Sequence, residues 1–415
     1  MLFRSLIFAL ARGGGLRGAL HGLWNTPHLL FGQQLAEWRL QLGRILFAAG
    51  LAAYEISVVF CNSMARQNWA WVQGVMSPVL EWLAFLCFGA KILFGTRYTW
   101  RELLAGGALY FIARWVYFNS QNIWWIGIVV AVLAAKDVPL RRPMQVYFAS
   151  GCAAMAVVLA LHFAGIVAPD LTSERMGALR GTYGYGHPNT FGGLVFGLVL
   201  AYALLRAQKV RWVDCLLVFA VGVFLLVGPA SRSAALCTLA LAVGLVFCRL
   251  RTGHSVPRWW PGTCAGMVGL TAAVSYLLPL LVIKVGPWNN DIGPAWLAKL
   301  DSLLTCRISL TWMAYRLLDV KIAGQVFNWP TVDNSFAFAL FQFGPVVAAL
   351  LGILFATALW GHAKQGRRVE VCCLFAMLAY AYMEVQPFHL TTNPTALLLC
   401  GAVFAQTSAR WQKIE

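Results

Sequence analysis

In the stretch RGTYGYGHPNTFGGLVFGLVLAYALLR (Arg180–Arg206), two features decide the fold of the chain. The second half is a continuous apolar segment, long enough to cross most of a membrane as a helix. The first half gathers Arg, Gly, Tyr, His, Pro and Asn directly before that helix. Pro188 suits the first helical position, because the N–H group that it lacks would be unpaired there. The stretch therefore predicts a membrane-spanning helix with a polar start at one face of the membrane.

Apolar segments of this kind recur through most of the chain. Apolar residues make up 60% and charged residues 11% of its 415 residues, whereas roughly a quarter of the residues of a soluble protein are charged. One span takes about 20 apolar residues, so we predict an all-α, polytopic integral membrane protein with about 12 transmembrane helices. The predicted spans are residues 45–61, 79–95, 103–118, 122–135, 145–168, 188–206, 212–229, 233–248, 262–283, 333–358, 370–386 and 392–407.

The basic residues predict the orientation. The net charge is +17, and with a cytoplasmic N-terminus 22 of the 32 Lys and Arg residues fall on cytoplasmic segments. Positive charge on short loops marks the cytoplasmic side. We therefore expect a multi-pass protein of the cytoplasmic (plasma) membrane with both termini in the cytoplasm. The charge is expected to contact membrane lipids, and nucleic acid is not expected as a partner.

Three parts of the chain are distinguished by composition. Residues 1–43 are basic and apolar and are interrupted by glycines, which predicts an amphipathic cytoplasmic segment. Residues 44–409 form the predicted transmembrane domain, and residues 410–415 form a cytoplasmic tail. Within the domain, residues 284–332 are too apolar for a flexible linker, and their roughly helical spacing predicts interfacial helices in a large extracytoplasmic loop.

The eleven cysteines lie mostly within apolar runs and show no metal-ligand spacing. We expect them to pack as small apolar side chains. Neither a metal site nor a disulfide with a functional role is predicted.

In this orientation, polar residues gather at helix starts on the outer face. The candidate helix caps are Ser231 or Ser233, Asp333 or Asn334, and Thr392 or Asn393. Such caps are ordinary features of helices, so none of them alone indicates a function. The arginines are harder to explain in that way, because an arginine near the hydrocarbon costs energy unless it is paired. The arginines concerned are Arg180, Arg232 and Arg307.

The segments around these arginines resemble a known family. GTYGYGHPN after Arg180, SRS around Arg232, and LDSLLTCRISL followed by VDNSFAFALFQFGPV resemble the Wzy-type polysaccharide polymerases, which are relatives of the O-antigen ligases. The forms are most similar to the Gram-positive exopolysaccharide (capsule) polymerases. The likeness covers about residues 170–400. The chain departs from the family at Thr305-Cys306, where Ser-Gly is usual before the loop arginine.

The resemblance implies a GT-C-like bundle and a specific reaction. A growing glycan is transferred from undecaprenyl diphosphate onto a lipid-linked repeat unit at the outer face of the cytoplasmic membrane. The enzyme would be a metal-independent glycosyltransferase without a cofactor. Its partners would be the undecaprenyl-diphosphate-linked oligosaccharide, membrane lipids, a flippase and a chain-length regulator.

The chemistry of this reaction assigns roles to individual residues. Breaking a sugar–diphosphate bond builds negative charge on the phosphate, which guanidinium groups stabilise. We therefore predict that the three outer arginines are catalytic. The acceptor hydroxyl needs a base, for which His187, Asp333 and Glu384 are alternatives; a His187 that merely hydrogen-bonds nearby backbone fits the sequence as well. Further predicted substrate contacts are Asn189, Asn334, Arg114 and Tyr185, with Tyr183, Glu55 and Glu81 as weaker candidates for contacting carbohydrate.

Other functions remain open at this level. An O-antigen-type ligase performs the same chemistry on another acceptor, and the sequence barely separates it from a polymerase. A multi-pass transporter or lipid-linked oligosaccharide flippase would also handle an anionic lipid. Transporters are often built from similar halves, and the loop at 284–332 has no counterpart in the first half. An inactive scaffold would not explain the clustered outer arginines.

Overall fold

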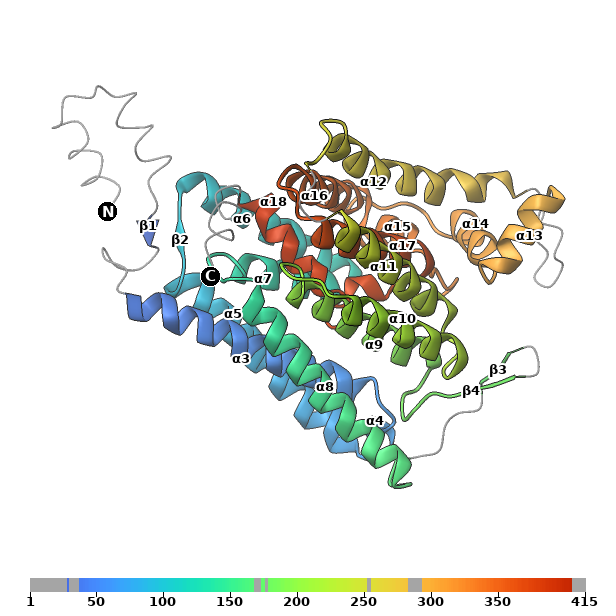
Figure 1. The fold of residues 1–415 in the computed structure, drawn as a ribbon, viewed down its shortest axis with the longest axis horizontal. Coiled ribbons are helices and arrows are strands. Elements are labelled where there is room, and N and C mark those ends of the chain that lie inside the picture. The colour runs from blue at the N-terminus through green and yellow to red at the C-terminus, as the bar shows by residue number, and fades with distance from the viewer. Residues whose placement is uncertain are drawn as a thin grey trace.

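The computed structural model describes residues 28–29, 37–167, 173–175, 178–251, 255–282 and 293–404. Across these ranges the fold is helical, with two short antiparallel β-ladders. Long helices run side by side between two ends of the molecule (Figure 1). The strands β1 and β2 lie at one end, and β3, β4, α13 and α14 lie at the other. The prediction of an all-α membrane protein is confirmed at this level.

The first part of the chain packs around α3. α3 contacts both α5 and α8, and α7 packs against α5 and α6. The elements are β1 (His28–Leu29), α3 (Glu37–Cys61), α4 (Ala65–Asn68), a π-helical turn η1 (Val72–Met76), α5 (Ser77–Phe94), β2 (Arg97–Tyr98), α6 (Trp100–Ser120), α7 (Ile123–Ala134) and α8 (Arg141–Phe163).

A hairpin then leads to the most buried long helix of the bundle, α9. The hairpin strands are β3 (Ser173–Arg175) and β4 (Ala178–Arg180), which pair in antiparallel register. α9 (Pro188–Leu205) packs against α8, α11 and α17, and most of its length is buried. It is followed by α10 (Trp212–Val227), α11 (Arg232–Leu250) and α12 (Trp260–Leu277).

The C-terminal part contains shorter and less regular elements. They are η2 (Leu278–Leu281), α13 (Ala295–Leu303), α14 (Arg307–Leu317), α15 (Ser335–Phe338), η3 (Ala339–Phe343), α16 (Pro345–Lys364), α17 (Arg368–Met383), η4 (Gln386–Phe388), η5 (Pro394–Leu399) and α18 (Cys400–Val403). The helices α13 and α14 fall within the predicted loop at 284–332 and pack, through Leu297 and Ile308, against Val282 at the end of η2. The side of the membrane on which they lie stays a prediction.

The predicted continuous span at 333–358 is wrong, because the helix breaks at Gly344. This glycine has a φ of 87°, in the left-handed region that favours glycine. A Cβ at this position would lie 2.2 Å from the carbonyl oxygen of Ile322, so the segment that contains Ile322 packs directly on the backbone here. One predicted span is therefore a short helical segment, 335–343, followed by the long helix α16.

Seven helices of the described ranges are long and apolar enough to cross a membrane. They are α3, η1 with α5, α8, α9, α11, α12 with η2, and α16. Large apolar side chains point outward along several of them, such as Trp82 at 70% exposure and Val243 at 69%, as expected where helices meet lipid. The total of about twelve spans stays a prediction. The proposed boundary at residue 43 falls inside α3, and the boundary at residue 410 lies outside the described ranges, as do residues 1–36 apart from 28–29.

Candidate functional site

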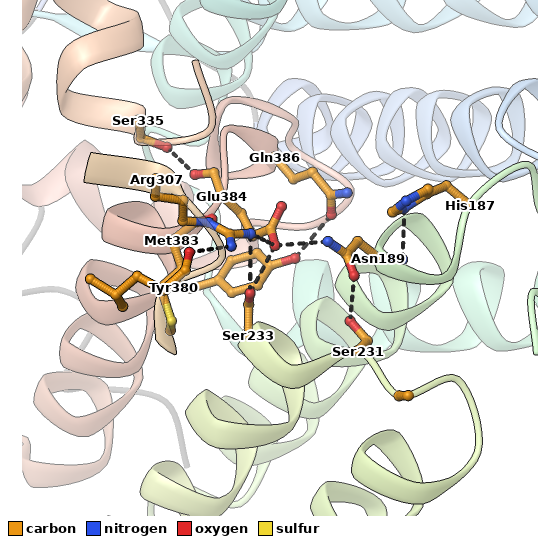
Figure 2. Close-up of polar contacts among 12 residues, drawn as sticks. His187, Asn189, Ser231, Ser233, Arg307, Ser335, Tyr380, Met383, Glu384 and Gln386 are labelled. Carbon is orange, nitrogen blue, oxygen red and sulfur yellow. Dashed lines mark hydrogen bonds and ion pairs between the residues drawn. The ribbon is translucent and has the colours of Figure 1, made fainter. Parts of the chain in front are cut away.

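The ends of several helices meet around one carboxylate, Glu384, which directly follows α17 (Figure 2). Glu384 is buried, and its Oε1 accepts three side-chain hydrogen bonds. Arg307 Nη2 donates at 2.6 Å, Ser233 Oγ at 2.8 Å and Asn189 Nδ2 at 3.0 Å. The donors come from the starts of α14, α11 and α9, so these three helix starts and the end of α17 lie at the same end of the bundle.

Asn189 connects this carboxylate to a second arginine. Its Oδ1 accepts a hydrogen bond from Arg180 Nη2 at 2.9 Å, while its Nδ2 donates to Glu384. Arg180 also donates to the carbonyl oxygen of Ala230 at 3.3 Å, and Ser231 Oγ donates to Asn189 Oδ1 at 3.4 Å. Arg180 is buried, at 7% exposure, at the end of β4. The structure thus brings two of the three predicted catalytic arginines into one hydrogen-bonded network.

Arg307 is almost fully occupied by partners. Its Nε donates to the carbonyl oxygen of Met383, its Nη1 donates to that of Leu304 at 2.9 Å, and its Nη2 donates to Glu384. The side chain is buried, at 7% exposure. These contacts fix the guanidinium against the end of α17, so its charge is held beside the carboxylate.

The backbone before Arg307 explains how the side chain reaches this position. Thr305 and Cys306 both have positive φ, 61° and 63°. Such values are uncommon for residues with a Cβ, above all for a β-branched threonine. Asp301 then stabilises the start of α14, because its Oδ1 accepts from the backbone N–H groups of Ile308 and Ser309. The chain therefore makes at Thr305-Cys306 the turn for which a Ser-Gly pair would be suited.

Two consecutive glycines in α9 allow the neighbouring elements of the site to pack closely against this helix. A Cβ at Gly192 would lie 2.3 Å from Ser231 Oγ, so only a glycine lets α11 approach α9 this closely. A Cβ at Gly193 would lie 1.9 Å from Gln386 Oε1 and 2.8 Å from Tyr380 OH. The two glycines of the segment NTFGG (residues 189–193) thus set the distance between α9 and the two elements that carry Ser233 and Glu384.

One oxygen of Glu384 is left without these donors. Oε2 points away from the three groups that bind Oε1 (Figure 2), and no hydrogen bond reaches it from the part of the chain that the structure describes. The backbone carbonyl of Glu384 accepts from Ser335 Oγ at 2.5 Å, which ties the residue to the start of α15. The carboxylate is therefore oriented firmly while one oxygen can still accept a proton or a hydrogen bond.

Two further predicted residues, Arg232 and His187, lie at helix starts next to the network. Arg232 is exposed at the first position of α11, beside Ser233. His187 is exposed and caps α9, with its Nδ1 accepting from the backbone N–H of Asn189 at 3.1 Å. This geometry agrees with the interpretation in which His187 only hydrogen-bonds nearby backbone.

The remaining predicted residues lie outside the network. The Arg114 guanidinium stands over the ring of Phe118 at 3.9 Å on α6. Tyr185 is fully buried against Phe191, which leaves no face of its ring exposed for a sugar. Asp333 is half-buried, and the next residue, Asn334, caps α15.

The sequence predicted some of these positions for the wrong reason and missed others. Ser233 was a candidate only as a helix cap, yet its hydroxyl binds Glu384. Asp301 and Ser335 were not singled out, although both fall within the segments that carry the family resemblance. Asn334 is the cap of α15, as predicted, with its Oδ1 accepting from Phe336 and Ala337 N–H groups.

Comparison of the chain with protein-family models, with curated proteins and with solved structures finds no match. The residues that the structure describes contain no group of three or more His, Cys, Asp and Glu side chains that could hold a metal ion. The fold and site define an all-α membrane protein with a buried Arg–Glu centre where several helix ends converge.

Proposed function

We propose that the protein is a polysaccharide polymerase that transfers a growing glycan from undecaprenyl diphosphate onto a lipid-linked repeat unit at the outer face of the cytoplasmic membrane. One observation carries the proposal: Arg180, Arg307 and Glu384 come from distant parts of the sequence and meet in one network at one end of a membrane bundle. The family resemblance selects Arg180 and Arg307, and Glu384 is one of the three residues predicted as alternatives for the base.

In this proposal Glu384 is the general base. The acceptor hydroxyl must lose a proton as its oxygen attacks the anomeric carbon, and a positioned carboxylate can take that proton. Oε1 is held by Arg307, Ser233 and Asn189, so Oε2 is the oxygen that faces the acceptor. Arg307 positions the base and keeps positive charge beside it. His187 is assigned the structural role of capping α9.

The departing diphosphate needs positive charge at the same end of the bundle. Arg232 is exposed at the start of α11, where the free N–H groups of the helix also favour an anion. Arg180 is connected to Glu384 through the side-chain amide of Asn189. These two guanidinium groups and the helix start are the groups that we assign to the leaving phosphate, and the polyprenyl chain would remain in the membrane.

A second candidate, a transporter of the lipid-linked oligosaccharide, is favoured by one feature of the first half. Glu55 is 1% exposed within α3, and its Oε2 makes no hydrogen bond in the described residues. Ionisable residues inside a span commonly mark pathways for ions or protons. If the protein is a transporter, the Glu55→Gln variant is expected to lose transport. If it is a polymerase, the same variant is expected to form polymer still.

Deletion of the gene in the native host tests the proposal. The expected result is that lipid-linked single repeats reach the outer face and accumulate there in place of long polymer. Single repeats retained on the cytoplasmic face would instead support the transporter, and unchanged polymer would contradict both.

Complementation of the deletion then tests the site. Glu384→Gln, Arg307→Ala and Arg180→Ala are each expected to abolish polymer while single repeats still reach the surface. Arg316→Ala is the matched control, because Arg316 lies on the same helix as Arg307 but is exposed and contacts Trp312. Normal chain length in all three site variants would overturn the assignment.

A further inference from the structure

The two thiols of Cys248 and Cys372 meet at the end of the bundle opposite Glu384. Cys248 lies near the C-terminal end of α11, and Cys372 lies in the second turn of α17. Their Sγ atoms are 3.5 Å apart, close enough for a thiol–thiol hydrogen bond. The residues are 124 positions apart in the sequence, so the tertiary packing of the two helices creates this pair.

The packing around the pair is tight and is fixed by two further contacts. A Cβ at Gly244, one turn before Cys248, would lie 3.1 Å from Cys372 Sγ, so the absence of a side chain there lets α17 approach α11 closely. One turn before Cys372, Arg368 Nη1 donates to the carbonyl oxygen of Arg251. The two helix ends are therefore clamped on both sides of the thiols.

We propose that Cys248 and Cys372 form a site of reversible oxidation, at which a peroxide converts the two thiols into a disulfide that joins α11 to α17. A disulfide needs an S–S distance of about 2.0 Å, which is about 1.5 Å shorter than the observed separation. The proposal requires rotation of the two side chains to close this difference. The inference does not depend on the proposed function.

The chemistry proceeds in two balanced steps. One of the two sulfurs attacks hydrogen peroxide, which gives a sulfenic acid and one water. The other thiol then attacks that sulfur, which forms the disulfide and releases a second water. The two thiols lose two electrons and two protons, and the peroxide is reduced to two waters.

The disulfide would hold together two helices that also carry the site. Ser233 lies in the first turn of α11 and Glu384 follows α17. Ser233 is about 22 Å along α11 from Cys248 at 1.5 Å per residue. The bond therefore acts at a distance from the carboxylate, by keeping the two helices in contact. It is expected to shift the midpoint of thermal unfolding upward, because it closes a long loop of the chain.

The test uses the purified full-length protein in lipid nanodiscs, treated with hydrogen peroxide and then with an alkylating reagent. Peptide mass spectrometry is expected to show a cross-linked Cys248–Cys372 peptide pair and the loss of two alkylatable thiols, both reversed by dithiothreitol. The cross-link is mapped in the unsubstituted protein, so the result does not depend on any variant folding.

Three variants make the assignment specific. Cys248→Ser and Cys372→Ser are expected to lose the cross-link, and Gly244→Ala is expected to lower its yield by pushing Cys372 away. Cys373→Ser is the matched control, because Cys373 is the buried neighbour of Cys372 and lacks this contact, so it should retain the cross-link. Oxidation to sulfinic acid without a cross-linked pair, or a cross-link that joins other cysteines, would overturn the proposal.

Discussion

The network around Glu384 and a second buried cluster around Lys136 both place charged groups inside the bundle, but the residues that form them differ in how far apart they lie in the sequence. Lys136 Nζ lies 3.3 Å from Glu102 Oε1 and 3.6 Å from Asp137 Oδ2. It also donates to the carbonyl oxygen of Arg97 at 2.7 Å, and Lys91 donates to the carbonyl oxygen of Lys136. All five residues fall between positions 91 and 137, so this cluster closes turns between neighbouring helices.

The Glu384 network is built from distant residues and from side chains alone around its carboxylate. Asn189 and Glu384 are 195 positions apart, and Arg307 and Glu384 are 77 apart. The two clusters lie towards opposite ends of the molecule, one near β2 and the other near α14 (Figure 1). The Lys136 cluster stabilises connections between segments that are close in sequence, whereas the Glu384 carboxylate, oriented by side chains with one oxygen left over, suits the base that we propose. Mutations should therefore separate the two clusters by their effect on activity.

Removal of the carboxylate is expected to have the largest effect. Glu384→Ala leaves Arg307 buried without its ion-pair partner, and breaking a buried pair costs about 3–5 kcal/mol. The midpoint of thermal unfolding in detergent should fall clearly, and polymer should be absent. Glu384→Gln separates the two effects, because its amide oxygen still accepts from Ser233 and Asn189 while it cannot act as a base. Full activity in Glu384→Gln would contradict the role of a base.

Removal of the Lys136 ammonium is expected to reduce stability without a specific effect on activity. Lys136→Met keeps the apolar stem but leaves Glu102 without its ion pair, and the expected loss is about 1–3 kcal/mol. Glu102 retains its capping bonds from Thr99 N–H and Oγ1, which limits the cost. Polymer formed per amount of folded protein, measured after quantifying the purified protein, should match the unsubstituted chain. A complete loss of polymer at normal protein level would erase the distinction between the clusters.

Next to each cluster, another part of the chain approaches a glycine closely. A substitution of each glycine therefore gives a matched pair of variants. Gly193→Ala would place a Cβ 1.9 Å from Gln386 Oε1, beside the Glu384 network, and Gly95→Ala would place one 2.7 Å from the Gly43 Cα, beside the Lys136 cluster. Overpacking of this kind costs about 1–3 kcal/mol. Both variants should unfold at lower temperature, but only Gly193→Ala should also lower the rate of polymer formation. Equal activity in the two variants would show that the spacing of α9 does not matter for the site.

The sequence predicted an all-α membrane protein, and it singled out the two arginines that the structure brings into one network, for a physical reason. Long apolar runs indicate spans wherever they occur, and arginine near hydrocarbon stands out because of its cost. The break at Gly344 could not be predicted in this way, because it follows from the packing of residues near Ile322 on that glycine. The central position of Glu384 likewise depends on which helix ends meet, and local sequence does not specify that.

The smallest predicted effect has the opposite sign and concerns the turn before Arg307. Cys306→Gly should stabilise the protein by about 0.5–1 kcal/mol, because glycine adopts the left-handed conformation of this exposed position without a Cβ penalty. The hydrogen bond from Ser309 Oγ to the carbonyl of residue 306 is kept. Cys152→Gly in α8 is the matched control, and should destabilise by about 1 kcal/mol, since glycine is unfavourable within a helix. Comparison of the two thermal midpoints checks the sign. A lower midpoint for Cys306→Gly would show that the cysteine side chain, rather than the backbone conformation, holds Arg307 in place.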